Sequence, residues 1–220
     1  MFFSSMRIGI IGTGIVGKTL GTKLAKLGHD VRMGSRAAGS EKAKAWVKET
    51  GSKSSEGTFA DAAAHGEIVF NCTSGTVSLE ALKAAGAQNL QGKVLIDVSN
   101  PLDFSKGMPP THSVCNTDSL GEQIQRAYPT AKVVKALNTV TAALMVEPSL
   151  IPGVHTIFVC GNDAKAKGVV IDLLKTGFGW KEVMDLGDIS AARAQEMYLA
   201  LWVRLFTKLK TPNVNIHVVF

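Results

Sequence analysis

Three glycines near the start of the chain have the spacing of a phosphate-binding turn. Residues 7–18 read Arg-Ile-Gly-Ile-Ile-Gly-Thr-Gly-Ile-Val-Gly-Lys, so that Gly12, Gly14 and Gly17 form the pattern GxGxxG between an expected strand and an expected helix. The first glycine permits a tight turn, the second lets the backbone approach a pyrophosphate, and the third lets the helix pack closely on the strand. The amide groups of the helix then face the phosphates. The residues expected to bind a dinucleotide here are Gly12, Thr13, Gly14, Ile15, Val16 and Gly17.

The end of the second expected strand distinguishes NADP from NAD. An NAD-binding protein usually has an Asp or Glu about 20 residues after the glycine motif, where it holds the ribose hydroxyls. This chain has Met-Gly-Ser-Arg there, so Ser35 and Arg36 stand where the acid would be, and Asp30 lies at the other end of the strand. A hydroxyl beside a guanidinium suits the extra phosphate of NADP. We therefore expect Ser35 and Arg36 to bind NADP(H), although Arg36 by itself could be an ordinary surface arginine.

Small polar residues follow three later strands. In a doubly wound sheet, ligands lie outside the carboxyl ends of the strands, where such groups can contact a nicotinamide or a flat second ligand. Asn, Ser and Thr also favour ordinary turns and helix caps, so each position taken singly is ambiguous, and the three together favour a site. The candidates are Thr73, Ser74, Asn100, Pro101, Asn138 and Thr139.

Candidate acids and bases are few. His112 lies in the long irregular segment 100–118, where it is either an exposed loop residue or within reach of a site. Lys135 lies inside an expected strand and either snorkels to the surface or acts as an acid beside a nicotinamide. No dyad of a short-chain dehydrogenase and no metal-ligand pattern is present, so we expect no catalytic side chain and no metal.

The order of the elements predicts an α/β fold with a doubly wound parallel sheet, because short β-branched runs alternate with helical patterns. We expect one NADP-binding domain over residues 1–220, with residues 189–220 as a small C-terminal helical extension. The expected strands are Arg7–Ile11, Val31–Gly34, Ile68–Cys72, Val94–Val98, Val133–Leu137, Thr156–Cys160 and Glu182–Asp185. The expected helices are Val16–Leu27, Ser40–Glu49, Ser78–Ala85, Ser119–Tyr128, Ala164–Thr176 and Ser190–Leu209.

The composition limits the classes of partner. The net charge is +6, but the basic residues are scattered, so we expect a small-molecule substrate and no nucleic acid. The three cysteines are too few for a disulfide framework, which fits a reducing compartment. Neither a secretory signal nor a membrane span is apparent, and we expect a soluble, cytoplasmic protein.

The last expected helix has more apolar surface than one sheet can cover. Tyr198, Trp202 and Phe206 form one stripe, and an adjacent stripe starts at Met197 and continues through Leu201 and Leu205. Core packing could account for one stripe, and a second subunit would accommodate both. We expect a homodimer.

The chain resembles a known family, the NADP oxidoreductases that depend on the deazaflavin coenzyme called factor 420. The likeness covers nearly the whole chain and rests on Met6–Gly14, Met33–Arg36, Val94–Leu102, Lys135–Val140 and Asp185–Asp188. It implies a nucleotide-binding domain with a small C-terminal extension, usually dimeric. It also implies that Thr13, Ser35 and Arg36 hold the NADP phosphates and that Ser74, Asn100, Asn138 and Thr139 line a ring pocket.

One segment departs from the family pattern. Better-known members place an apolar or Pro-containing segment after the third expected strand, where this chain has Cys72-Thr73-Ser74-Gly75. The cytoplasmic domains of a family of ferric reductases have a similar layout and reduce a flavin. The second substrate is therefore expected to be a deazaflavin or a flavin, reduced by ring-to-ring hydride transfer, which needs proximity more than acid–base groups. The alternatives are an NADPH-dependent reductase of a small carbonyl or imine, and a non-catalytic NADP sensor.

Overall fold

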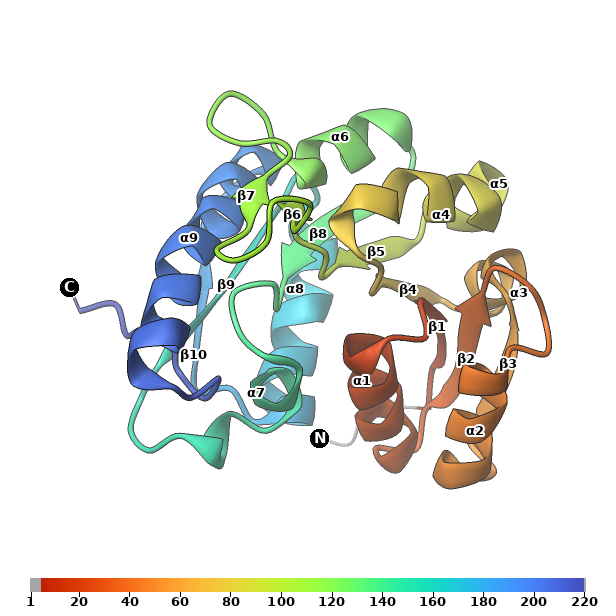
Figure 1. Ribbon diagram of the computed structural model, residues 1–220. Helices are drawn as coiled ribbons and strands as arrows, with labels where there is room; N and C mark the ends of the chain where they lie inside the picture. The colour runs from red at the N-terminus through yellow and green to blue at the C-terminus, as the bar shows by residue number, and fades with distance from the viewer. Residues whose placement is uncertain (1–4, 220) are drawn as a thin grey trace.

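The computed structural model describes residues 5–219 and contains an eight-stranded sheet in the order β10-β9-β8-β5-β4-β1-β2-β3 (Figure 1). The six strands from β8 to β3 are parallel, whereas β9 runs antiparallel to β8 and β10 is parallel to β9. The predicted α/β class is confirmed. The strands are β1 (Arg7–Ile11), β2 (Asp30–Ser35), β3 (Ser54–Thr58), β4 (Ile68–Asn71), β5 (Val94–Asp97), β8 (Lys132–Ala136), β9 (Thr156–Gly161) and β10 (Glu182–Asp185).

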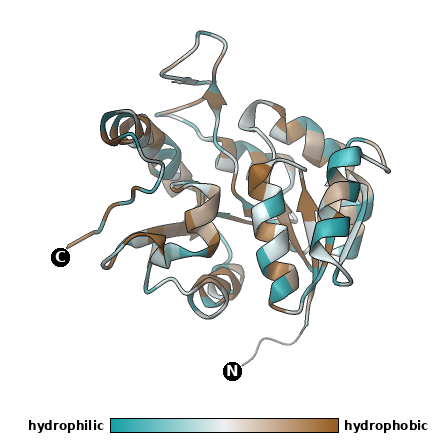
Figure 2. Ribbon diagram, turned by 60° about the horizontal axis from the view of Figure 1, so that its bottom comes forward, coloured by the Kyte–Doolittle hydropathy of each residue, from teal (hydrophilic) through white to brown (hydrophobic). Residues whose placement is uncertain are grey.

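Helices cover both faces of the sheet because apolar side chains project from each strand in alternation. Ile10 of β1 faces one core and Ile11 the other, as Ile96 and Leu95 of β5 also do. One face carries α1 (Ile15–Lys26), α2 (Glu41–Thr50), α7 (Ala142–Val146) and α8 (Ala164–Asp172). The other carries α3 (Phe59–His65), α4 (Ser78–Ala85), α5 (Ala87–Leu90) and α6 (Leu120–Ala127). Figure 2 shows the outcome, since the helices have mixed colours and the strands between them are mainly hydrophobic.

The structure adds elements that sequence patterns did not predict. Strand β3 and helix α3 occupy residues 54–65, to which the sequence analysis assigned no strand or helix. Strand β3 reads Ser-Ser-Glu-Gly-Thr and forms the edge of the sheet, so it has no apolar alternation to reveal it. Helix α3 begins with a capping box between Thr58 and Asp61, which satisfies the first amide groups. The shorter additions are helices α5 and α7, the hairpin of β6 (Leu102–Asp103) and β7 (Thr111–His112), the 3₁₀ turns Gly75–Val77, Pro148–Leu150 and Ile189–Ala191, and the π-helical segment Leu173–Phe178.

Helix α9 (Ala192–Leu209) packs against α6 through a side that the sequence analysis did not single out. Its buried apolar residues are Ala192, Leu199 and Val203. The predicted stripe of Tyr198, Trp202 and Phe206 flanks this side and is half-buried. The stripe that starts at Met197 lies on the opposite side of the helix, where Met197 and Leu201 are exposed. The segment after α9 returns along the helix: the Trp202 indole donates to the Val214 carbonyl, and the Thr156 amide donates to the Ile216 carbonyl.

Candidate functional site at the carboxyl edge of the sheet

The glycine turn between β1 and α1 is shaped by three different constraints. Gly12 has φ +118°, and a Cβ there would lie 2.8 Å from the Cys72 carbonyl oxygen. A Cβ at Gly17 would lie 2.3 Å from the Gly12 carbonyl oxygen, so helix and strand could not approach as they do. At Gly14, the first residue before α1, nothing stands within 4 Å of that position. The turn is therefore tightly packed at Gly12 and Gly17, and it leaves free space at Gly14, next to the amino end of the helix, where a pyrophosphate binds.

Ser35 and Arg36 lie beside this turn at the end of β2. Arg36 is exposed and lines a cleft of about 460 Å³ together with the glycine turn and the loop after β4. The Ser35 side chain is buried, and its hydroxyl donates to the Ala37 carbonyl at 2.5 Å, so it orders the turn that presents Arg36. Residues on the cleft wall are Gly12, Thr13, Gly14, Arg36, Phe59, Cys72, Thr73, Ser74, Val77, Glu80, Ala81 and Ala84.

The loops after β4 and β5 are in close contact. A Cβ at Gly75 would lie 2.1 Å from the Asn100 carbonyl oxygen, so the glycine is needed for this approach. Thr73 is half-buried and donates through its hydroxyl to Asn71 Oδ1 at 2.7 Å, and Ser74 is exposed. The two predicted segments thus form one continuous wall beside the glycine turn.

Asn100 and Asn138 bind each other across the ends of β5 and β8. Asn138 Nδ2 donates to Asn100 Oδ1 at 2.9 Å, and Asn100 Nδ2 donates to the Asn138 carbonyl at 2.8 Å. Leu137, the residue before Asn138, has φ 66°, a conformation that residues other than glycine rarely adopt. Pro101 and Thr139 are buried next to this pair.

The fourteen predicted site residues follow β1, β2, β4, β5 and β8, which are neighbours in the sheet, so the fold gathers them at one edge. Ile15, the first residue of α1, exposes 78% of its surface there. Ligand sites typically combine apolar surface with a few polar groups. The edge thus offers phosphate-binding backbone, a cation, amide groups and one apolar wall.

A row of polar side chains runs across the sheet just beneath this edge. Asn71, Asp97 and Lys135 occupy the same register on β4, β5 and β8, and they point to the face covered by α6. Lys135 is completely buried, and its Nζ donates to Asp97 Oδ2 at 2.8 Å and to the Ser99 carbonyl at 2.6 Å. The predicted snorkelling of Lys135 is therefore wrong, because β8 is central and no surface is within its reach.

Glu196 of α9 completes the environment of Lys135. Its Oε1 lies 2.7 Å from Lys135 Nζ. The same carboxylate accepts hydrogen bonds from the amides of Leu120 and Gly121 at the start of α6, at 2.9 and 3.0 Å. Burial by itself lowers the pKa of Lys135, but the adjacent Asp97 and Glu196 carboxylates outweigh it and raise that pKa. Lys135 is a permanent cation with its three N–H groups engaged.

The other reactive side chains near the edge are also engaged or protonated. His112 lies in β7, and its Nε2 is 2.9 Å from the Glu196 carbonyl oxygen. Burial raises the pKa of the Cys72 thiol, so this residue stays protonated at neutral pH. Burial likewise raises the pKa of Cys160 to about 12. Neither cysteine is an activated nucleophile.

The comparison with known proteins identifies the family. The family described as "NADP oxidoreductase coenzyme F420-dependent" matches residues 7–101, from β1 to the loop after β5. The F420-dependent NADP reductase of Methanocaldococcus jannaschii is 31% identical over 97% of this chain and 98% of its own length. The chain belongs to this family. It is an NADP-dependent oxidoreductase, and the resemblance, the fold class and the enzyme class predicted from its sequence are confirmed.

Two further relatives extend the comparison. A protein from Arthrobacter sp. FB24, assigned as an F420-dependent NADP reductase, has a crystal structure with a TM-score of 0.94 and 50% identity over 98% of this chain and 100% of that one. Metalloreductase STEAP3 of Rattus norvegicus is 29% identical over 94% of this chain, which corresponds to 38% of that protein. The family and the methanogen enzyme's name imply NADP and coenzyme F420 as the cofactors.

Sequence reasoning missed two residues of this oxidoreductase's carboxyl edge, Asp97 and Glu196. Asp97 ends an apolar strand and Glu196 lies in an amphipathic helix, and the two residues are 0% and 1% exposed. Charged side chains are almost never fully buried unless they are paired. An Asp and a Lys, each near the end of an apolar strand, could have been recognised as a pair, whereas nothing local connects Glu196 to them.

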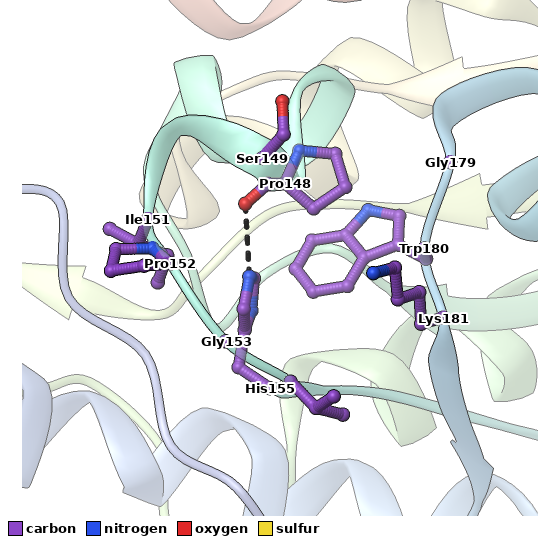
Figure 3. A pocket seen from close by; sticks show the side chains of 10 residues that line it. Pro148, Ser149, Ile151, Pro152, Gly153, His155, Gly179, Trp180 and Lys181 are labelled. Atoms are coloured by element: carbon purple, nitrogen blue, oxygen red, sulfur yellow. Dashed lines mark hydrogen bonds between the residues drawn. The ribbon is translucent and has the colours of Figure 1, made fainter.

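A separate pocket of about 210 Å³ lies away from the predicted site, between Pro148–His155 and Gly179–Lys181 (Figure 3). Both ring nitrogens of His155 have partners there, the Pro148 carbonyl and Asn215 Nδ2. The Trp180 indole donates to the Met145 carbonyl. The pocket therefore lies between the 3₁₀ turn Pro148–Leu150 and the residues just before β10, and neither His155 nor Trp180 offers it a free polar group.

Two absences apply to the described part of the chain. Within residues 5–219, His, Cys, Asp and Glu form no group that could hold a metal ion. No helix in that same range is long and apolar enough to cross a membrane.

Proposed function

We propose that this NADP-dependent oxidoreductase transfers a hydride between NADP(H) and a deazaflavin or flavin by direct ring-to-ring contact. The observation that carries the proposal is the engagement of Lys135, the strongest candidate acid. All three of its N–H groups point to buried protein oxygens and not toward the edge where a substrate would lie. Hydride transfer between stacked rings needs orientation and exclusion of water, and the proton that balances it can come from solvent.

The NADP side of the site uses the glycine turn and the end of β2. The open space beside Gly14 admits the pyrophosphate to the amides of α1, whose first turn carries no acidic residue. Arg36 would hold the additional phosphate of NADP. Ser35 would order the turn that presents Arg36 and would also contact that phosphate. Thr13, Thr73 and Ser74 line the same cleft and would contact the phosphates and ribose.

The ring side of the site uses the paired asparagines. Asn100 and Asn138 would fix the plane of the nicotinamide or of the acceptor ring, because their mutual hydrogen bonds hold them rigid. Thr139 is buried beside them, and its hydroxyl has no protein partner among the described residues, so it is available to a ligand. Ile15 would supply an apolar surface for a ring.

The test is the oxidation of NADPH, followed by the absorbance of the reduced nicotinamide, with three classes of acceptor. We expect turnover with a deazaflavin or with free flavins and little turnover with small carbonyls or imines. His112→Ala should keep most of the turnover, since loss of a true acid or base costs about 10²- to 10⁴-fold. Turnover only with carbonyls or imines would contradict the proposal, and so would loss of turnover in His112→Ala. Either result would favour an NADPH-dependent reductase of a small carbonyl or imine. Absence of turnover with every acceptor, despite NADPH binding, would favour a sensor.

We also propose that the protein is a homodimer that uses α9. Met197 exposes 42% and Leu201 exposes 53% of its surface, and both lie on the outer side of a helix whose other side is already packed. Such an apolar surface is unusual on a soluble monomer. Light scattering at micromolar concentration should give twice the chain mass, and Leu201→Glu should give the monomer mass. A monomer mass for the unmutated protein would contradict this proposal.

A cytoplasmic location remains a prediction. The three cysteines are unpaired in the structure, and two of them are buried. Free thiols without disulfides fit a reducing compartment.

A further inference from the structure

We propose that the buried cluster of Asp97, Lys135 and Glu196 positions Asn100 and Asn138 for the transfer, and so makes helix α9 a working part of the site. This inference rests on the proposed ring-binding role of the two asparagines. None of the three charged residues would touch a substrate, because each is at most 1% exposed. They would act through the residues that do.

The cluster and the asparagines form one closed circuit of contacts. Lys135 Nζ donates to the carbonyl of Ser99, which precedes Asn100 in the chain. Asn100 and Asn138 are hydrogen-bonded to each other, and Asn138 Nδ2 also donates to the Gln195 carbonyl at 3.2 Å. Gln195 precedes Glu196 in the chain, and the Glu196 carboxylate forms an ion pair with Lys135, which closes the circuit. Displacing any member of the circuit therefore displaces the asparagine pair.

The circuit also reaches the cofactor side. Asp97 Oδ1 accepts hydrogen bonds from Asn71 Nδ2 at 2.9 Å and from the Ser99 hydroxyl at 2.6 Å. Asn71 Oδ1 accepts the hydroxyl of Thr73, which lines the cleft. The charged cluster thus connects Thr73 on the cofactor side with the asparagine pair on the ring side. These two parts of the site would have to hold the two rings in register.

The energetic character of the cluster supports positioning over simple stabilisation. Buried charges are costly to desolvate, and packed apolar residues often stabilise a core equally well. What charged pairs add is fixed direction, since each donor must meet its acceptor. Here Lys135 meets three oxygens, and Glu196 meets two amides at the start of α6 as well as Lys135.

A second contact fastens α9 and supplies a matched control. Arg193 of α9 forms two hydrogen bonds to Glu122 of α6, at 2.8 and 2.6 Å. Glu122 accepts the Ser119 hydroxyl as well, and among residues 5–219 it forms no hydrogen bond or ion pair with Lys135 or with either asparagine. Glu122 and Glu196 therefore both join α9 to α6, but only Glu196 belongs to the circuit.

The experiment compares Glu196→Gln with Glu122→Gln in the full-length protein. Glu196→Gln should fold, because Asp97 still balances the charge of Lys135. We expect it to lower kcat with the acceptor by about 10- to 100-fold, the scale of small misplacements, while the Kd of NADPH changes by less than about two-fold. Glu122→Gln should leave kcat within about two-fold, even if its melting temperature falls as much as that of Glu196→Gln. Glu196→Asp, which keeps the charge, should recover part of the loss.

A second readout does not need the acceptor. The fluorescence of the bound reduced nicotinamide reports how its ring is held, and we expect Glu196→Gln to change its emission and anisotropy while Glu122→Gln does not. Where Glu196→Gln yields no folded protein, Asp97→Asn makes the same test from the other side of Lys135.

Two results would overturn the inference. The first is an unchanged kcat and an unchanged nicotinamide signal in Glu196→Gln or Asp97→Asn. The second is equal losses in Glu196→Gln and Glu122→Gln, which would mean that the cluster only fastens α9. Failure of the unmutated protein to reduce any deazaflavin or flavin would instead refute the proposed function, and the nicotinamide signal would still decide the positioning role.

Discussion

The two halves of the carboxyl edge are built in opposite ways. Around the glycine turn, residues close together in sequence act through backbone shape and one exposed cation, Arg36. Around Lys135, the contacts join residues that are far apart: Asp97 lies 38 positions away, and Glu196 reaches Leu120 across 76 positions. Gly14 and Arg36 of the first half are exposed to solvent, whereas the charged residues of the second half are buried.

This difference separates binding from positioning. An exposed, preformed turn can receive phosphates with little rearrangement of the protein. A buried network depends on the complete fold, because every partner comes from a different element. We therefore expect substitutions of the exposed residues Gly14 and Arg36 to act on cofactor affinity and substitutions in the cluster to act on stability and turnover.

The largest expected effect comes from removing the central cation. Lys135→Met leaves the Asp97 and Glu196 carboxylates buried without their shared partner, and breaking a buried pair in this way costs about 3–5 kcal/mol. Urea denaturation should show the loss as a lower midpoint with a similar slope. Lys132→Met on the same strand is the control, since Lys132 is half-exposed and pairs with Asp163 at 3.6 Å. Similar stabilities for the two variants would refute the structural importance of the cluster.

The next effect concerns the choice of dinucleotide. Arg36→Ala should weaken NADPH binding by about 1.5–3 kcal/mol, the range for hydrogen bonds to charged groups, and leave NADH binding nearly unchanged. Calorimetry with both dinucleotides measures the difference. Arg32→Ala is the matched control, because Arg32 lies in β2, the strand that Arg36 follows, and donates to the Ser55 hydroxyl. If the unmutated protein binds NADPH and NADH equally, Arg36 does not select the cofactor.

Two glycines separate the folding role of the turn from its binding role. Gly17→Ala places a Cβ 2.3 Å from the Gly12 carbonyl oxygen, so we expect a loss of about 1–3 kcal/mol in the free energy of unfolding. Gly14→Ala meets no atom within 4 Å and should retain or slightly raise stability. Its methyl group would stand where the pyrophosphate approaches, and NADPH affinity should fall. Thermal unfolding and calorimetry on both variants test this, and unchanged NADPH affinity in Gly14→Ala would contradict the assignment.

The same contrast explains what the sequence could and could not predict. The glycine turn, Ser35 and Arg36 were predictable because their signal is local: a motif, a strand before it and a missing acid after it. The exposed position of the Thr73–Ser74 loop and the partnership of Asn100 with Asn138 follow from adjacent strands ending at one edge.

The unpredicted parts depend on tertiary contacts. Strand β3 carries no apolar alternation and exists because it pairs with β2. The fate of Lys135 could not be inferred from β8 alone, since its partners come from β5 and from α9. The inner side of α9 was not predicted for a related reason: Glu196 and Gln195 are polar residues that face the core, which a hydrophobic stripe cannot reveal.

The smallest expected effect comes from an ion pair outside the buried network. Asp118 accepts hydrogen bonds from Arg126 at 3.0 and 2.7 Å, and these bonds hold the pKa of Asp118 at about 2. Because this value lies below the usual pKa of about 3.9, the pair stabilises the fold above about pH 4 and loses that contribution as the pH falls toward about 2. Arg126 is largely exposed, so solvent screens the pair, and Asp118→Asn should lower Tm at pH 7 by at most about 3 °C. Calorimetry at pH 7, 4 and 3 should show the difference between variant and unmutated protein shrinking with acidity. A difference in Tm as large as that of Lys135→Met, or one that does not depend on pH, would show that exposure does not separate this pair from the buried cluster.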